Sequence, residues 1–181
     1  ELKDILLETK LFDAIRDESL QVFYQPKIDL KTEKIVGMEA LIRWFDDELG
    51  FIPPDRFIPF AEKSGLILSI GKWVLKTACW DTLMWNTAYN LNLRVAVNMS
   101  PIQLAMPNIV ESIEEILEET RINPKFLEIE ITEMSMVDYT DELINKIQRI
   151  RDLGITISID DFGTGYSSLS YLKNLPVDAL K

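Results

Sequence analysis

Four short hydrophobic runs, rich in Val and Ile, each contain an acidic or amide side chain at the point where the run breaks. They span residues 37–41, 95–100, 127–133 and 157–163, and carry Glu39, Asn98, Glu130 with Glu133, and Asp160 with Asp161. Runs of this kind are typical of buried strands, and the later ones are separated by about thirty residues, the length of one strand–helix unit. In barrels built from such units, the catalytic residues lie at the ends of the strands. The pattern therefore predicts an α/β fold with an all-oxygen site for a hard divalent cation.

The alternation of side chains along a strand sorts these runs onto two faces. One face carries the bulky apolar residues Met38, Ala40, Val95, Val97, Ile129, Ile131, Ile157 and Ile159. The other carries the small or polar residues Gly37, Glu39, Ala96, Asn98, Glu128, Glu130, Ser158 and Asp160. Buried carboxylates are costly unless they are paired or bound to metal. The polar face therefore predicts a cation bound at the mouth of the barrel. A two-sided antiparallel sheet with a solvated polar face is the alternative, which the amphipathic helices between the runs disfavour.

The N-terminal third predicts a helix followed by a hairpin. An amphipathic helix, or a linker from an upstream domain, is expected over residues 1–18, and the barrel domain over residues 19–181. Residues 21–30 and 34–44 predict two antiparallel strands, because only three polar residues join them.

The middle and the end of the chain predict alternating helices and strands. Three prolines predict an extended loop over 50–59, with Pro59 opening the next helix. The helix predicted over 71–88 carries an apolar stripe of Trp73, Thr77, Trp80 and Met84, which is expected to pack on the sheet. Further helices are expected around 109–117 and 141–150, and further strands over 94–98, 126–131, 155–159 and from 177 onwards.

Composition excludes several kinds of chemistry. The chain has no His, so imidazole catalysis and histidine-ligated zinc are excluded, and its one cysteine, Cys79, cannot form an internal disulfide. A net charge of −11 argues against binding along a DNA or RNA polymer. It does not exclude a nucleotide substrate, because a cation can screen a phosphate from carboxylates. No apolar stretch is long enough to span a bilayer, and a cytoplasmic domain is expected.

Four motifs occur in order along the chain. They are Glu39–Trp44, Asn98–Ser100, Glu130–Glu133 and Asp160–Leu169, and residues 24–26, 57–59 and 175–178 accompany them. Together they closely resemble the EAL domain, the family of cyclic di-GMP phosphodiesterases. The resemblance implies a modified TIM (βα)8 barrel with one antiparallel strand, a two-metal site for Mg²⁺ or Mn²⁺, and hydrolysis of cyclic di-GMP to the linear dinucleotide pGpG.

The resemblance also assigns roles to individual residues. It places Glu39, Asn98, Glu130 and Asp160 on one metal and Asp161 on the second. It implies that Arg43 grips a phosphate oxygen, that Gln25 positions the substrate, that Lys181 assists the nucleophilic water, and that Glu133 anchors the loop 162–168. Without the resemblance, Arg43 is equally compatible with a structural ion pair. Likewise, Gly163-Thr164-Gly165 is compatible with an ordinary turn.

The chain departs from the family pattern in two places, of which only the second bears on activity. Asp46-Asp47 replaces a His-Pro pair, and the domain is expected to continue beyond Lys181 with its last strands and its general base. We therefore expect the barrel to be incomplete at its C-terminus in this chain, and residues 1–181 alone to be inactive. The alternative function is a catalytically inactive EAL-like module that binds cyclic di-GMP or a protein partner. A homodimer, through 166–172, and an upstream sensory or GGDEF-type domain are the expected partners.

Overall fold

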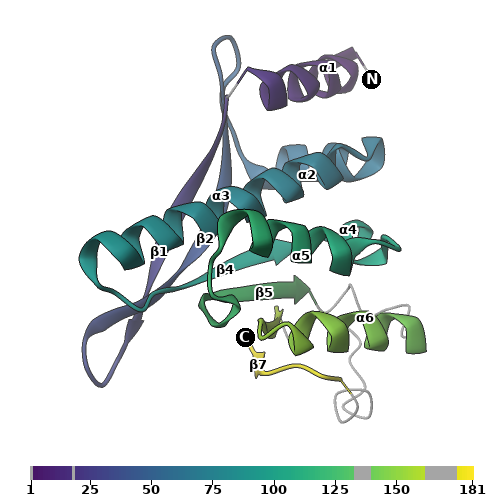
Figure 1. Cartoon of the computed structure of the whole chain (residues 1–181). Coiled ribbons are helices and arrows are strands. Elements are labelled where there is room, and N and C mark those ends of the chain that lie inside the picture. The colour runs from purple at the N-terminus through teal and green to yellow at the C-terminus, as the bar shows by residue number, and fades with distance from the viewer. Residues whose placement is uncertain (1, 18, 133–139, 162–174) are drawn as a thin grey trace.

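A seven-stranded sheet carries the fold, and helices α3, α5 and α6 lie over it (Figure 1). The computed structural model describes residues 2–17, 19–132, 140–161 and 175–181. The helices are α1 (Leu2–Arg16), α2 (Pro54–Ser64), α3 (Leu66–Tyr89), α4 (Pro101–Ala105), α5 (Ile109–Thr120), the 3-10 turn η1 (Pro124–Phe126) and α6 (Asp141–Asp152). The strands are β1 (Leu20–Asp29), β2 (Lys34–Asp46), β3 (Gly50–Ile52), β4 (Arg94–Met99), β5 (Leu127–Thr132), β6 (Thr156–Asp160) and β7 (Ala179–Leu180).

The strand order is β1-β2-β4-β5-β6-β7, with β3 paired to β2. β1 and β3 run antiparallel to β2, whereas β2, β4, β5, β6 and β7 are parallel to one another. Parallel neighbours require crossover connections, and α3, α5 and α6 supply those of the β2–β4, β4–β5 and β5–β6 pairs. The predicted mixed α/β fold and the N-terminal antiparallel hairpin are confirmed.

The bulky face of the strands forms the core. All eight of its predicted apolar residues are buried, namely Met38, Ala40, Val95, Val97, Ile129, Ile131, Ile157 and Ile159. Helix α3 contacts β1, β2 and β4, and α6 contacts β6. Helix α1 joins the same core through Leu7 and Leu11, and its Lys10 forms a 3.1 Å ion pair with Asp46. Among the helices that the structure describes, none is both long and apolar enough to cross a membrane.

The prediction of an extended loop over 50–59 is wrong. Residues 50–52 form β3, and α2 begins at Pro54 and continues through Pro59. Pro54 suits the first helical turn because no intrahelical bond is required of its nitrogen there. Pro59 removes one backbone hydrogen bond from the helix, and the buried side chains of Phe57 and Ala61 hold α2 in place despite that loss.

The predicted packing stripe on α3 is also wrong. Trp73, Trp80 and Met84 face outward and are 37%, 43% and 59% exposed. The buried side of α3 instead carries smaller residues, which are Ile67, Ile70, Val74, Leu75, Ala78, Cys79 and Thr82. Small side chains let a long helix lie close to the sheet, and both stripes have helical spacing, so only the tertiary packing decides between them. Cys79 is buried on this side of α3, and burial raises the pKa of its thiol to about 12.

Asp178 directs the chain into β7. Its Oδ2 accepts a hydrogen bond from the Ile157 N–H at 3.0 Å, and its Oδ1 accepts one from Arg151 Nε at 2.9 Å. Burial acts to raise the pKa of the Asp178 carboxyl, but these donors outweigh it and hold the pKa below its usual value.

Asp178→Asn is expected to lower stability in a pH-dependent way. A folded-state pKa below the unfolded-state value of 3.8 means that the carboxylate stabilises the fold fully above pH 3.8. That stabilisation is lost as the pH falls from there through the folded-state pKa. The gap in denaturation midpoint between wild type and D178N should therefore shrink between about pH 6 and about pH 3. Asp47→Asn, at an exposed aspartate, is the control. A gap for D178N that is constant across this range would contradict the assignment.

Candidate active site

The strand register gathers the predicted polar residues on the face opposite the core. Gln25 lies directly across from Glu39 in the β1–β2 hairpin, and Asn98 pairs with Glu130 between β4 and β5. Asn98 Nδ2 donates a 2.8 Å hydrogen bond to Glu39 Oε1, which links the end of β4 to the middle of β2. Asp160 continues the series on β6, where it is half-buried and pairs with Thr132. Four of the predicted metal ligands therefore share one face.

Glu130 lies at the centre of this face, with only 1% of its side chain exposed. Lys27 Nζ, from edge strand β1, lies 2.7 Å from Glu130 Oε1, and Lys181 Nζ, which follows edge strand β7, contacts the same oxygen. In a flat sheet β1 and β5 would lie roughly 14 Å apart, further than a lysine side chain reaches. The sheet therefore curves like a barrel wall, and both of its edges turn towards one buried carboxylate.

Glu128 extends this charged network along β5. Its Oε1 lies 2.6 Å from Lys181 Nζ and accepts a 2.8 Å hydrogen bond from Ser158 Oγ. Burial acts to raise the pKa of Glu128, but the bonds from Lys181 and Ser158 outweigh it and lower the pKa. For Lys181, burial acts to lower the pKa, yet the bonds to Glu128 and Glu130 raise it above its usual value. Lys181 is therefore an ammonium ion at neutral pH.

Asp161 leaves the strand in a different conformation from Asp160. Its φ of 56° lies in the left-handed region, which aspartate tolerates better than most residues. This turn ends the alternation of β6, so two consecutive carboxylates are not forced to opposite faces. Glu133 and the loop 162–168 lie outside the described residues, and their predicted roles stay predictions.

A cavity of about 460 Å³ opens at the C-terminal ends of β2, β4 and β5. Arg43, Asn98 and Thr132 line it from the strands, and Glu62 and Gln103 line it from helices α2 and α4. Arg43 Nη1 donates a 2.8 Å hydrogen bond to the Ile42 carbonyl, and its side chain is half-buried. Arg43 therefore lines a cavity beside the Glu39–Asn98 pair.

The predicted ligands do not all converge in the present arrangement. Within residues 2–132, 140–161 and 175–181, apart from residue 18, no three acidic side chains form a ready cation site. Glu39 bonds to Asn98, while Glu130 is neutralised by the two lysines.

The sequence analysis placed Glu128 on the polar face without giving it a role, and it did not identify Lys27 as a member of the site. Glu128 shares the strand face of Glu130, so its inward direction was visible in the alternation. Lys27 lies across from Gly37 in the hairpin only because the register shifts between Lys27 and Ile28. The strands are joined by four residues, 30–33, rather than by the three predicted, so regular pairing from the turn would have placed Lys27 opposite Val36. Position 37 requires a glycine, because a Cβ there would lie 2.7 Å from the Arg94 carbonyl oxygen.

Comparisons with known proteins match this architecture. The cyclic di-GMP phosphodiesterase NbdA of Pseudomonas aeruginosa is 41% identical over 179 residues, which cover 99% of this chain and 23% of NbdA. The cyclic di-GMP phosphodiesterase PdeR of Escherichia coli is 40% identical over 175 residues, which cover 97% of this chain and 26% of PdeR. The structure of the PaMucR phosphodiesterase in complex with c-di-GMP superposes with a TM-score of 0.92 at 39% identity, covering 97% of this chain and 71% of that one.

These matches define the family but cover only part of each curated relative. The chain spans 23% of NbdA and 26% of PdeR, so the activities of those whole proteins do not transfer to it directly. The EAL domain itself matches residues 8–181, which include every strand and all but the start of α1. The resemblance recognised in the sequence is confirmed, and the chain belongs to the EAL domain family.

Proposed function

We propose that this chain is the catalytic part of a phosphodiesterase that hydrolyses cyclic di-GMP to pGpG with Mg²⁺ or Mn²⁺. The observation that supports this most is the placement of Glu39, Asn98 and Glu130 on one strand face, beside the cavity lined by Arg43. The relatives NbdA and PdeR carry the same activity in their names.

The donor atoms of the site suit a hard cation. Carboxylate and amide oxygens are the ligands that Mg²⁺ and Mn²⁺ prefer, and Glu39, Asn98, Glu130 and Asp160 offer only such oxygens towards a metal. The 99% burial of Glu130 also calls for positive charge, which Lys27 and Lys181 supply in this structure. Asp161 would serve a second ion. Bound cations would supply Lewis acidity and lower the pKa of an attacking water.

The protein's own groups would orient the substrate and hold the water. Arg43 would donate to a phosphate oxygen in the cavity, and Gln25, opposite Glu39, would position the dinucleotide. Because Lys181 has a raised pKa, it would act as a charged hydrogen-bond donor to the water rather than as the group that takes its proton. Glu133 would hold the loop that carries the residues after Asp161.

Removal of divalent cations is expected to abolish hydrolysis. The protein with its natural flanking sequence, supplied with Mg²⁺ or Mn²⁺, should convert cyclic di-GMP to pGpG. The substrate should persist after treatment with EDTA and be cleaved again when either ion is restored. Separation of the nucleotides by liquid chromatography measures all three states. Turnover that survives EDTA would contradict the proposal. Binding of cyclic di-GMP without cleavage in the presence of both ions would instead support the inactive binding module.

A further inference from the structure

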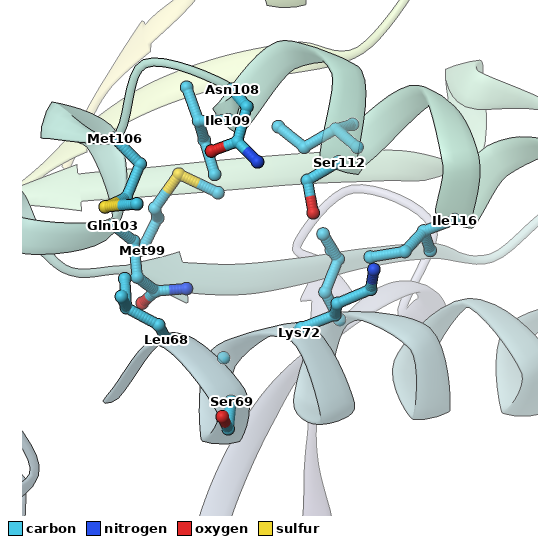
Figure 2. Close-up of a pocket in the computed structure, with 13 residues that line it drawn as sticks. Leu68, Ser69, Lys72, Met99, Gln103, Met106, Asn108, Ile109, Ser112 and Ile116 are labelled. Carbon is cyan, nitrogen blue, oxygen red and sulfur yellow. The ribbon is translucent and has the colours of Figure 1, made fainter. Parts of the chain in front are cut away.

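Gln103 of α4 forms part of the wall between two cavities. One is the cavity at the strand ends, and the other is a pocket of about 290 Å³ between α3 and the α4–α5 segment (Figure 2). Gly71, Met99 and Gln103 line both. The Gln103 side chain is only 7% exposed, so its position is set by packing rather than by solvent.

A reciprocal pair of hydrogen bonds ties Gln103 to the end of β4. Gln103 Oε1 accepts from the Ser100 N–H at 3.1 Å, and Ser100 Oγ accepts from the Gln103 N–H at 3.3 Å. The Ser100 carbonyl accepts from the Leu104 N–H at 3.1 Å. This capping box starts α4 and at the same time fixes the backbone two residues beyond Asn98. The pattern Ser-Pro-Ile-Gln in the sequence could have revealed this short helix.

Gly71 supplies the space that the Gln103 amide occupies. A Cβ at position 71 would lie 1.9 Å from Gln103 Nε2 and 2.8 Å from Oε1, so any other residue must displace that amide. Glycine is unfavourable in a helix interior, and position 71 lies well inside α3. The close approach to Gln103 explains why a glycine is present there.

We propose that Gln103, accommodated by Gly71, is a positioning residue that holds Asn98 in its bonded orientation towards Glu39. The bonds to Ser100 fix the direction in which β4 ends, and the 2.8 Å contact between Asn98 and Glu39 depends on that direction. Displacing Gln103 frees the Ser100 N–H and lets the strand end move. This inference rests on the proposed function, because it assigns Asn98 to the cation site.

Gly71→Ala separates this role from a purely structural one, because its two effects have opposite signs. Alanine favours the helix by about 1 kcal/mol, which offsets the cost of displacing Gln103, so the melting temperature should stay close to that of wild type. Displacement of Gln103 should raise the Mn²⁺ concentration needed for half-saturation about 10–100-fold, the range typical of residues that orient metal ligands. Calorimetric titration with Mn²⁺ alone, performed on the protein with its natural flanking sequence, measures this without any need for turnover. Amide hydrogen exchange should show lost protection at Ser100.

Three further variants sharpen the test. Gln103→Ala should weaken Mn²⁺ binding like Gly71→Ala, and the double variant should be no weaker than either, because both changes remove the same contact. Lys72→Ala, the next residue of α3 on the same pocket, should leave Mn²⁺ binding unchanged. Full protection of Ser100 and wild-type Mn²⁺ affinity in Gly71→Ala would overturn the proposal. Failure of the proposed function would show differently, as a wild-type protein that does not cleave cyclic di-GMP even though the exchange result holds.

Discussion

Glu130→Gln and Asp160→Asn are each expected to lower the turnover of cyclic di-GMP by more than about 10²-fold. Each change replaces a carboxylate oxygen with a neutral amide at a site proposed to hold hard cations, whose charge stabilisation contributes several kcal/mol to such reactions. The two residues lie on neighbouring strands, β5 and β6, and differ in burial, since Glu130 is fully buried and Asp160 half-buried. Initial rates with saturating Mn²⁺ measure the effect.

The difference in burial makes the two variants a useful pair. Glu130→Gln leaves Lys27 and Lys181 without their shared carboxylate, so part of its effect is exerted through the fold. Asp160→Asn leaves the Lys27 and Lys181 ion pairs with Glu130 intact. The circular dichroism spectrum of this variant should therefore match that of wild type. Glu118→Gln, on the exposed side of α5, is the matched control and should retain full activity. Near-normal rates in both site variants would refute the cation site.

Trp44→Ala is expected to lower the free energy of unfolding by about 3 kcal/mol, within the usual range for deleting a buried aromatic side chain. Trp44 is fully buried and packs edge-on against Phe57, with ring centroids 5.5 Å apart. Its indole N–H has no hydrogen-bond partner in the part of the chain that the structure describes. The substitution therefore also removes an uncompensated polar group, which places the loss near the lower end of the range. Denaturant unfolding followed by fluorescence measures it.

Trp80→Ala makes the same chemical change on the outer side of α3. Trp80 is 43% exposed, so its loss is expected to lower the free energy of unfolding by about 1 kcal/mol or less. The comparison also tests the orientation of α3. A larger loss for Trp80→Ala than for Trp44→Ala would mean that the aromatic stripe of α3 faces the core after all.

The site was partly visible in the sequence because a strand has a strict alternation. Once Glu130 was placed on a strand, Glu128 and the opposite face followed from geometry alone. The same reasoning failed on α3, where the aromatic residues and the smaller residues both have helical spacing. A helix has no covalent constraint on which apolar stripe meets the sheet, and the closer packing of small side chains decided it.

The sequence by itself determined the N-terminal hairpin, the alternation of the later strands with helices, the polar face and the family of this chain. These depend on local periodicity and on residue types at fixed spacings, which are complete in the sequence. Only the tertiary structure decided that Lys27 and Lys181 meet at Glu130, and that Gly71 accommodates Gln103. Those contacts join residues 103, 51 and 32 positions apart, so they depend on how far the sheet curves and how closely the helices pack against it. Curvature and packing are sums over many weak contacts, and no local pattern encodes them.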